Sequence, residues 1–168
     1  SYGLHEGKPF KTRSKKIELY NSRYAEKGID PMPVYKPPKT VPAEKFRMVV
    51  GRNAYITQSA STNNTILWEL EHENSLWIHP KPARRIGIRQ GEMVEVTSSA
   101  GAGRLKAQVT DRIRPDTVYM DTGYGVMSKG LSKIYGKGAC IADVLEDSAD
   151  RISGNMAMHE TIVSVRRV

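Results

Sequence analysis

The sequence predicts a mainly β protein in which six or more short strands, with one or two short helices, close into a barrel. Two observations support this prediction. Several short segments alternate apolar and polar side chains, as half-buried strands do. Glycine and proline residues separate these segments at short intervals and mark turns. A closed barrel leaves no exposed sheet edge, and it therefore suits a chain of many short strands.

The segment 77–101 contains the clearest succession of elements. A short apolar strand ends at His79, and Pro80 begins a turn of helix. Gly87 and Gly91 bracket a tight turn, because glycine adopts backbone angles that other residues reach only at a steric cost. Mixed apolar and polar residues then predict a half-buried strand. Ala83 and Ile86 of the helix are expected to face inward, and the apolar residues of the strand pattern are Met93, Val94 and Val96.

Further elements follow from the same patterns. Thr62–Glu73 has Ile66, Leu67 and Leu70 at helical spacing, and Thr62 or Asn63 is the expected N-cap. Pro115-Asp116 marks a turn between two strands. The additional strands are expected at Phe46–Val50, Arg104–Thr110, Thr117–Asp121 and Thr161–Val165.

The chain is expected to divide near Ala43 into an arm and one barrel domain. Residues 1–42 hold six of the nine prolines, which disfavour helix and favour extended, polyproline-like backbone. Lys16–Tyr20 could still add a short strand. Residues 43–168 are long enough to bury one core. The sequence begins at Ser1 without methionine, and we interpret it as an excised fragment of a longer protein.

The positive net charge of the chain raises the question of which anionic partner its basic residues contact. The chain carries 26 Lys and Arg against 18 Asp and Glu, a formal net charge of +8. A nucleic-acid-binding protein usually concentrates charge on one face, often beside stacking aromatics, whereas here the basic residues are scattered and 7% of residues are aromatic. We therefore expect no nucleic-acid partner. The basic groups are solvated, or they complement an anionic cofactor or an acidic neighbouring domain.

The known catalytic and metal-binding motifs are missing from the sequence. Cys140 is the only cysteine, so this chain forms neither an internal disulfide nor a thiolate cage for an iron–sulfur cluster. The four histidines are too dispersed to suggest a zinc site. There is no Walker loop, nucleophile elbow or apolar run of membrane-spanning length. We predict no catalytic residue and no metal ligand here.

A polar loop from Arg52 to Asn64 is the best candidate for ligand binding. Hydroxyl and amide side chains dominate this loop, which joins a predicted strand to a predicted helix. The free N–H groups and the positive dipole end of a helix N-terminus favour an anion. The alternative is an ordinary polar loop whose side chains cap the helix. The residues alone favour this alternative.

Several segments together resemble the C-terminal domain of the molybdopterin oxidoreductases related to dimethyl sulfoxide reductase. The run HPKPARRIGIRQGEMVEV, residues 79–96, is similar to that family's pattern of Asn or His, Pro, Ala, Gly-Ile, Gly-Asp or Gly-Glu, and Val-x-Val. FKTRSKKIELY at 10–20, followed by DPMP at 30–33, resembles the thiosulfate and polysulfide reductase branch. GRNAYITQSASTNN at 51–64 is similar to that branch's first cofactor-binding loop.

The resemblance implies a six-stranded double-psi β-barrel, of the aspartate decarboxylase-like kind. It further implies that the chain binds a bis-molybdopterin guanine dinucleotide cofactor of molybdenum, or of tungsten, in a reductase of anaerobic respiration. Iron–sulfur clusters and the metal's protein ligand would lie in upstream domains, so this chain alone would be inactive. The implied partners are those domains, an iron–sulfur electron-transfer subunit and a membrane anchor subunit. The resemblance is compatible with a periplasmic location, or one at the outer membrane face.

The resemblance also assigns candidate cofactor contacts. In the polar loop these are Arg52, Thr57, Gln58, Ser59 and Thr62. His79 stands where the family has Asn or His facing the cofactor. GACIADVL at 138–145 and DRISG at 150–154 resemble the family's last landmark, but an asparagine often found there is replaced by Ala142-Asp143. The remaining candidates are Asp143, Asn155 and His159, for which an exposed C-terminal loop is the alternative.

Two other classes of function stay open at this point. The chain could be a standalone small subunit that completes a molybdenum or tungsten site in trans. It could also be a double-psi barrel that binds nucleic acid or protein, in which case its binding to DNA would weaken steeply with salt.

Overall fold

The computed structural model describes Gly3 and residues 5–168, which form two compact units that divide between Pro38 and Lys39. The first unit contains a short helix, α1 (Ser22–Glu26). This helix corrects the expectation of extended backbone, because the prolines of this region all lie outside it. None of the helices among the described residues has the length and apolarity needed to cross a membrane.

The short strand that Lys16–Tyr20 could have added is absent, because this segment has no strand pairing. Side-chain hydrogen bonds set the local backbone instead. The Ser14 N–H donates to the Glu18 carboxylate at 2.7 Å, and the Thr12 hydroxyl donates to the Lys16 carbonyl at 2.6 Å. An extended segment needs a partner strand for its backbone groups, and these residues lack one.

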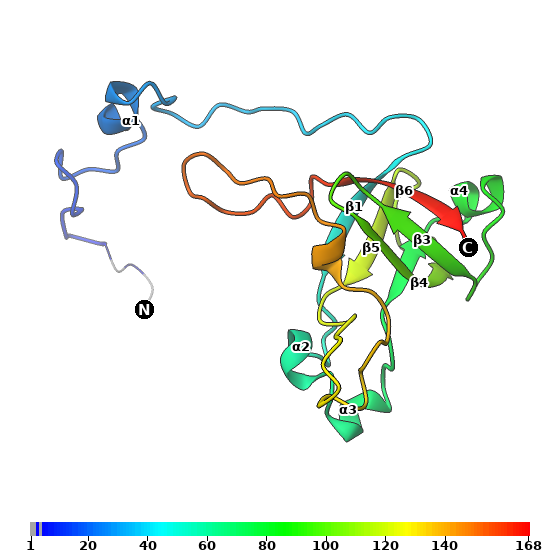
Figure 1. Cartoon of the computed structure of the whole chain (residues 1–168). Helices are drawn as coiled ribbons and strands as arrows, with labels where there is room; N and C mark the ends of the chain where they lie inside the picture. Colours follow the sequence, from blue (N-terminus) through cyan, green and yellow to red (C-terminus); the bar gives the residue numbers. More distant parts are fainter. Residues whose placement is uncertain (1–2, 4) are drawn as a thin grey trace. The chain divides into compact units, whose positions relative to one another are not determined.

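The described residues of the second unit form a closed barrel, which Figure 1 shows with its strands crossing one another obliquely. Its strands are β1 (Phe46–Gly51), β2 (Ser75–Ile78), β3 (Met93–Thr97), β4 (Ala102–Val109), β5 (Thr117–Asp121) and β6 (Ile162–Arg167). Every strand expected from the sequence is present, with ends that differ by a few residues at β4 and β6.

The strand order identifies the barrel topology. The strands close as β1-β5-β2-β4-β3-β6, with β1 parallel to β5 and β2 parallel to β4. The other neighbouring pairs are antiparallel. Exchanging β1, β2 and β3 with β4, β5 and β6 reproduces the same set of pairs, so two three-strand halves interlock. This is the six-stranded double-psi β-barrel that the resemblance implies, and that prediction is confirmed.

Alternate residues of each strand fill the barrel, as the two-residue side-chain period of a strand requires. Each fully buried aliphatic side chain contributes roughly 1.5–3 kcal/mol relative to an exposed one, so this interior dominates the stability of the unit. The buried strand residues that point inward are Phe46, Met48, Val50, Leu76, Ile78, Val94, Val96, Leu105, Ala107, Val118, Met120, Val163 and Val165.

The helix α4 (Pro80–Arg85) and the turn after it agree with the sequence prediction. His79 is the N-cap, and its Nδ1 accepts a hydrogen bond from the Lys81 N–H at 3.1 Å. Ala83 is buried, and Ile86 packs against the core. The two turn glycines have φ angles of 72° and 76°, which are strained for any residue with a side chain.

The single helix predicted over Thr62–Glu73 is wrong in its extent. The structure has two one-turn helices, α2 (Gln58–Ser61) and α3 (Thr65–Trp68). Asn64 separates them, with a ψ of 128°, and its side chain caps α3 by accepting from the N–H groups of Ile66 and Leu67. The predicted N-cap is thus displaced to Asn64. Ile66 and Leu70 are exposed, so their helical spacing does not mark a buried face here.

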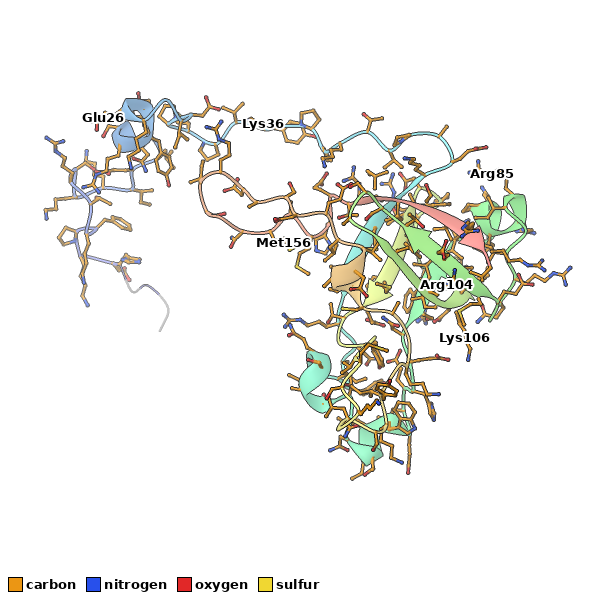
Figure 2. The ribbon with its side chains drawn as sticks, viewed as in Figure 1. Glu26, Lys36, Arg85, Arg104, Lys106 and Met156 are labelled. Atoms are coloured by element: carbon orange, nitrogen blue, oxygen red, sulfur yellow. The ribbon has the colours of Figure 1, made fainter. Side chains whose placement is uncertain are left out.

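A charged cluster joins three strands on the outside of the barrel. The Glu95 carboxylate of β3 accepts hydrogen bonds from Arg104 on β4 and from Arg166 on β6, both at 2.8 Å. These arginines lower the pKa of the Glu95 carboxyl, Arg104 more than Arg166. Figure 2 shows Arg104 and Lys106 pointing away from the barrel interior. Strand β3 can therefore carry a nearly buried acid between two buried valines.

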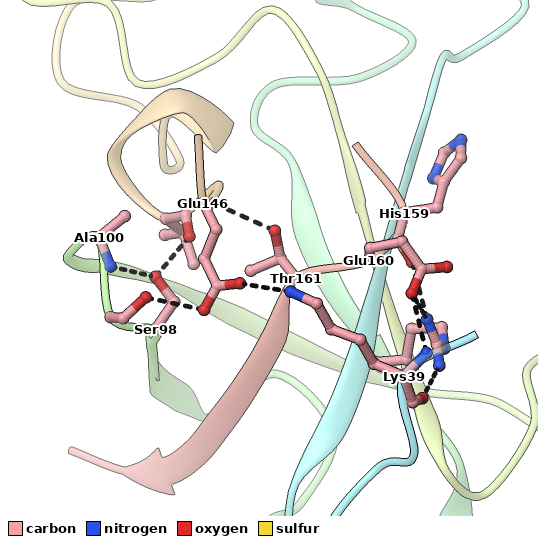
Figure 3. Close-up of polar contacts among 10 residues, drawn as sticks. Lys39, Ser98, Ala100, Glu146, His159, Glu160 and Thr161 are labelled. Atoms are coloured by element: carbon pink, nitrogen blue, oxygen red, sulfur yellow. Dashed lines mark hydrogen bonds and ion pairs between the residues drawn. The ribbon is translucent and has the colours of Figure 1, made fainter. Parts of the chain in front are cut away.

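A second polar network ties the start of this unit to the barrel (Figure 3). The Lys39 ammonium lies 3.5 Å from the Glu146 carboxylate, and the Lys39 N–H donates to Glu160 at 3.4 Å. Arg47 of β1 pairs with the same Glu160 at 2.6 Å and also donates to the Lys39 carbonyl. Lys39 thus belongs to the barrel unit, and the boundary between the units lies just before it.

Candidate functional site

A cavity of about 400 Å³ lies at the barrel end where β1 and β5 terminate. Gly51 pairs with Asp121, so the two parallel strands end side by side and the loops that follow them meet. The ends of these parallel strands thus bring separate loops together. The lining residues are Gln58, Ser59, Thr122, Gly123, Tyr124, Gly125, Val126, Cys140, Ile141 and Met158.

Two glycines allow the cavity walls to approach one another closely. A Cβ on Gly123 would lie 2.6 Å from the Gln58 carbonyl carbon, and one on Gly125 would lie 2.2 Å from the Cys140 nitrogen. Their φ angles of 99° and 73° also favour glycine. Because no side chain intervenes at these contacts, main-chain groups border the cavity.

The polar loop contributes two of its five candidate residues to this cavity. Gln58 and Ser59 line it, and Gln58 has a φ of 48°, which is uncommon for a residue with a side chain. Thr62 is buried, and its hydroxyl donates to the Ser59 carbonyl at 3.1 Å. The Thr62 hydroxyl therefore stabilises the local turn. Arg52 and Thr57 are exposed outside the cavity lining.

The two candidate histidines lie at different ends of the barrel. His159 is next to the lining residue Met158, and its Nδ1 accepts a hydrogen bond from the Val50 N–H at 3.3 Å. His79 follows Ile78, which pairs with Val118 near the start of β5. The cavity lies beyond the end of β5. The structure therefore brings His159, and not His79, close to Gln58 and Ser59.

The last two candidates are exposed and lie in different segments. Asp143 ends the short helix η1 (Ile141–Asp143), whose first residue lines the cavity. Asn155 lies in the loop that projects from the barrel beside the labelled Met156 in Figure 2. Its carbonyl accepts from the Asp150 N–H at 2.8 Å. The structure places Asp143 near the cavity rim and Asn155 in this projecting loop.

A buried acidic cluster adjoins the cavity. The Tyr119 hydroxyl donates to the Asp121 carboxylate, and Tyr124 is 3% exposed. Burial raises the pKa of both tyrosine hydroxyls well above the usual range, and the negative charges of Asp121 and Glu71 add to this. Burial also raises the pKa of the Glu71 carboxyl, and Asp121 adds a smaller effect. The Glu71 carboxyl and the two tyrosine hydroxyls therefore favour their protonated forms.

Three buried polar atoms of this region lack hydrogen-bond partners among the described residues. They are Glu71 Oε2, Thr122 Oγ1 and the Tyr124 hydroxyl. Thr122 and Tyr124 also line the cavity. A buried polar group without a partner costs free energy, so such atoms mark places where water or a ligand group bonds. Across the part of the chain that the structure describes, no three His, Cys, Asp or Glu side chains gather as a metal site.

Sequence reasoning missed a fully buried asparagine behind the cavity. The Asn74 amide donates to the carbonyls of Asp121 and Ala139, at 2.8 and 2.9 Å, and accepts from the Ala139 N–H at 2.9 Å. Its only signal in the sequence is an asparagine directly before a predicted strand, which a turn explains equally well. Cys140 and Met158 were also missed as lining residues, since both lie in loops without a distinctive pattern.

Comparison with known proteins decides the family. Residues 46–162 match the model of the family described as the Molydopterin dinucleotide binding domain. The chain belongs to this family. The matched residues begin at β1 and end at the start of β6, so the match includes β1 to β5 and every residue that lines the cavity.

Individual relatives of this dinucleotide-binding domain are large molybdopterin proteins. The chain is 28% identical to the thiosulfate reductase molybdopterin-containing subunit PhsA of Salmonella typhimurium, over 94% of this chain and 21% of that protein. It is 27% identical to the arsenate respiratory reductase subunit ArrA of Chrysiogenes arsenatis, over 95% and 24%. It is 26% identical to the dimethyl sulfoxide reductase DmsA of Escherichia coli, over 97% and 22%.

A solved structure agrees with the fold. The acetylene hydratase from Pelobacter acetylenicus superposes with a TM-score of 0.80 at 22% identity, over 94% of this chain and 24% of that one. The domain thus spans less than a quarter of the length of each of these proteins.

Proposed function

We propose that this dinucleotide-binding domain is part of a larger molybdenum oxidoreductase and that its cavity holds part of a molybdopterin guanine dinucleotide. The membership of the family supports the cofactor class. The observation that carries the position is the cavity itself, where main-chain walls, two polar side chains and the unpartnered Thr122 hydroxyl border one space. Such a set of groups fits a flat ligand with hydrogen-bonding edges.

The residues around the cavity supply different interactions. The Gln58 amide both donates and accepts, and the Ser59 hydroxyl does the same, so either can meet a ring edge or a phosphate oxygen. Arg52 follows β1 at the same barrel end and offers a charged, planar donor. His159 presents a ring whose Nδ1 is already engaged by Val50. When bound, the cofactor would supply the metal centre of the redox reaction, since these residues supply only binding and orientation.

For the whole enzyme we propose a respiratory reductase of the thiosulfate or polysulfide type. The run at 10–20 and the likeness to the thiosulfate reductase subunit favour this branch. The arsenate and dimethyl sulfoxide reductases have similar identities, so substrate assays on the full-length enzyme must choose. These should compare thiosulfate, polysulfide, arsenate and dimethyl sulfoxide. The further domains, an iron–sulfur subunit and a membrane anchor belong to the same proposal.

The cavity assignment can be tested by filling the cavity with a side chain. Ser59→Trp adds bulk to a lining position of α2, whereas Ala60→Trp adds the same bulk to an exposed neighbour outside the lining. Molybdenum and guanine nucleotide should be measured per purified full-length subunit. We expect Ser59→Trp to lose most of both, and Ala60→Trp to retain them. Full retention in Ser59→Trp would place the cofactor elsewhere.

A further inference from the structure

We call residues 138–141 the wall segment, because two of them line the cavity. At Ala139 this segment has no partner strand, and its backbone groups make hydrogen bonds to a side chain instead. Asn74 accepts from the Ala139 N–H and donates to the Ala139 carbonyl, both at 2.9 Å. Its amide thus replaces the two ladder bonds that a neighbouring strand would make. The same NH₂ group donates at 2.8 Å to the carbonyl of Asp121, where β5 ends.

Asn74 is tightly packed, and neither water nor an added side chain fits beside it. Asn74 is 0% exposed and Ala139 is 6% exposed, so water does not replace these bonds if they are lost. A Cβ on Gly138 would lie 2.1 Å from Asn74 Oδ1, and the Gly138 φ of 64° also favours glycine. One face of the wall segment is therefore held by the asparagine, while Cys140 and Ile141 border the cavity.

We propose that Asn74 is a positioning residue that holds the wall segment in place and so sets the shape of the cavity. Asn74 itself is absent from the cavity lining. It acts through Ala139 on the next two residues of the chain. As far as the ligand is concerned, the proposal rests on the cofactor function proposed above. The holding role itself is independent of that function.

The single thiol of the chain reports on the wall. Cys140 is half-buried, lines the cavity and is the only cysteine, so the rate of its alkylation by iodoacetamide reports how tightly the wall segment is held. In the 168-residue chain we expect Asn74→Ala to accelerate alkylation at least about tenfold, the factor that corresponds to roughly 1.4 kcal/mol. A folded Asn74→Ala chain with the wild-type rate would overturn the proposal.

Two matched variants separate a loosened wall from general destabilisation. Asn64→Ala removes another hydrogen-bonding asparagine side chain, which caps α3 and does not touch the wall. Val94→Ala weakens the barrel core at β3. Both should leave the Cys140 rate close to wild type under conditions where the chains are folded. An equal acceleration in Val94→Ala at matched melting temperature would mean that Asn74 only contributes to overall stability.

If the Asn74→Ala chain does not fold, Asn74→Asp provides a second test of the holding role. The carboxyl retains an acceptor for the Ala139 N–H, and when protonated it also donates one bond to a carbonyl. Burial favours this neutral form, whereas the ionised form faces two carbonyl oxygens. The ratio of variant to wild-type alkylation rates should therefore rise with pH, since thiolate formation affects both rates alike. A ratio that stays at one across the pH range would overturn the holding role.

The ligand part of the proposal has its own readout. In the full-length enzyme purified with its molybdopterin cofactor, wild-type Cys140 should be protected from iodoacetamide relative to the cofactor-free enzyme. Equal reactivity in the two forms, together with acceleration in Asn74→Ala, would retain Asn74 as the holder of the wall and refute the cofactor assignment. Protection without acceleration would do the opposite.

Discussion

At the scale of single residues, the cavity adjoins two acidic side chains that have no cationic partner among the described residues. Glu71 and Asp121 lie near the hydroxyls of Tyr119 and Tyr124, and no ion pair to either carboxylate occurs among the described residues. Two neighbouring acids without a cation favour proton uptake by one of them. The raised pKa of the Glu71 carboxyl means that this acid takes up its proton at a higher pH than an ordinary glutamate does.

Glu71→Gln should stabilise the chain near neutral pH and change it little in acid. The pKa of the Glu71 carboxyl is raised above its ordinary 4.5, mainly by burial. The folded state therefore holds this proton more tightly than the unfolded state. This tighter proton binding stabilises the folded state fully below about pH 4.5, the ordinary pKa. The stabilisation is lost as pH rises through the pKa of the folded state. Glutamine removes that loss, so the melting-temperature gain should grow with pH.

The control for this prediction is Glu69→Gln, an exposed acid two residues earlier in the chain. Its melting-temperature difference from wild type should stay nearly constant across the same pH range. A constant difference for Glu71→Gln as well would show that Glu71 does not titrate abnormally.

Arg52→Ala should lower cofactor retention in the full-length enzyme more than Gln58→Ala does. A hydrogen bond to a charged group contributes roughly 1.5–3 kcal/mol, against about 1 for a neutral one. Arg52→Lys should recover only part of the loss, because lysine lacks the planar fork. Arg52 is exposed, so melting temperatures should hardly change. Molybdenum and nucleotide content are the measurements, and full occupancy in Arg52→Ala would refute the contact.

At the scale of elements, the segment between β1 and β2 shows how capping replaces a longer helix. Asn64 accepts two backbone hydrogen bonds at the start of α3, at 2.9 and 3.3 Å. Thr57, at the corresponding position of α2, makes no side-chain cap. An N-cap residue has extended backbone, so a strong cap inside an apolar pattern divides the helix. This break lets α2 turn Gln58 and Ser59 toward the cavity while α3 lies apart (Figure 1).

The two caps differ in a way that melts can measure. Asn64→Ala should destabilise the chain by about 0.5–2 kcal/mol, the usual cost of losing a bonded N-cap. Thr57→Ala should be nearly neutral, since no cap bond is lost. Urea unfolding of both variants beside the wild type provides the comparison. Equal losses in the two would show that the cap bonds do not determine the local stability.

At the scale of the whole molecule, closure of the barrel makes the second unit self-sufficient. The strands from β1 to β6 close a complete ring, and Lys39 adds contacts to Glu146 and Glu160 outside it. A chain of 39–168 should therefore melt cooperatively, close to the melting temperature of the 168-residue chain. A chain of 46–168 loses the Lys39 contacts and should melt lower. An uncooperative melt of 39–168 would contradict self-sufficiency.

The 168-residue chain should nevertheless bind the free pterin dinucleotide poorly. The residues that border the cavity here all come from this chain. The relatives contain about four to five times as many residues as the part they share with it. We expect the remaining contacts to come from those additional domains. Calorimetry should show a cooperative melt with little shift on addition of cofactor. A tight, saturable complex would refute this expectation.

The sequence by itself determined the barrel elements, because their signals are local. The mixed apolar and polar pattern of Met93–Thr97 and the glycines of the preceding turn act over a few residues, and the structure has a strand and two positive φ angles at these places. The burial within this strand does not alternate, because Val94, Glu95 and Val96 are all buried. The polar loop was also identifiable, since Gln58 and Ser59 follow a strand and precede a helical pattern. The double-psi topology came only with the family resemblance, because strand order depends on pairings between residues far apart in the chain.

The tertiary structure alone decided which of the candidate residues share one space. His79 and His159 look alike as strand-flanking histidines, yet the register of β2 against β5 sends the first to the far end of the barrel. Asn74 became visible only when its bonds to residue 139, 65 positions away, were seen. A local pattern specifies the backbone of a segment, whereas a cavity wall depends on contacts between segments, and those are set when the whole barrel closes.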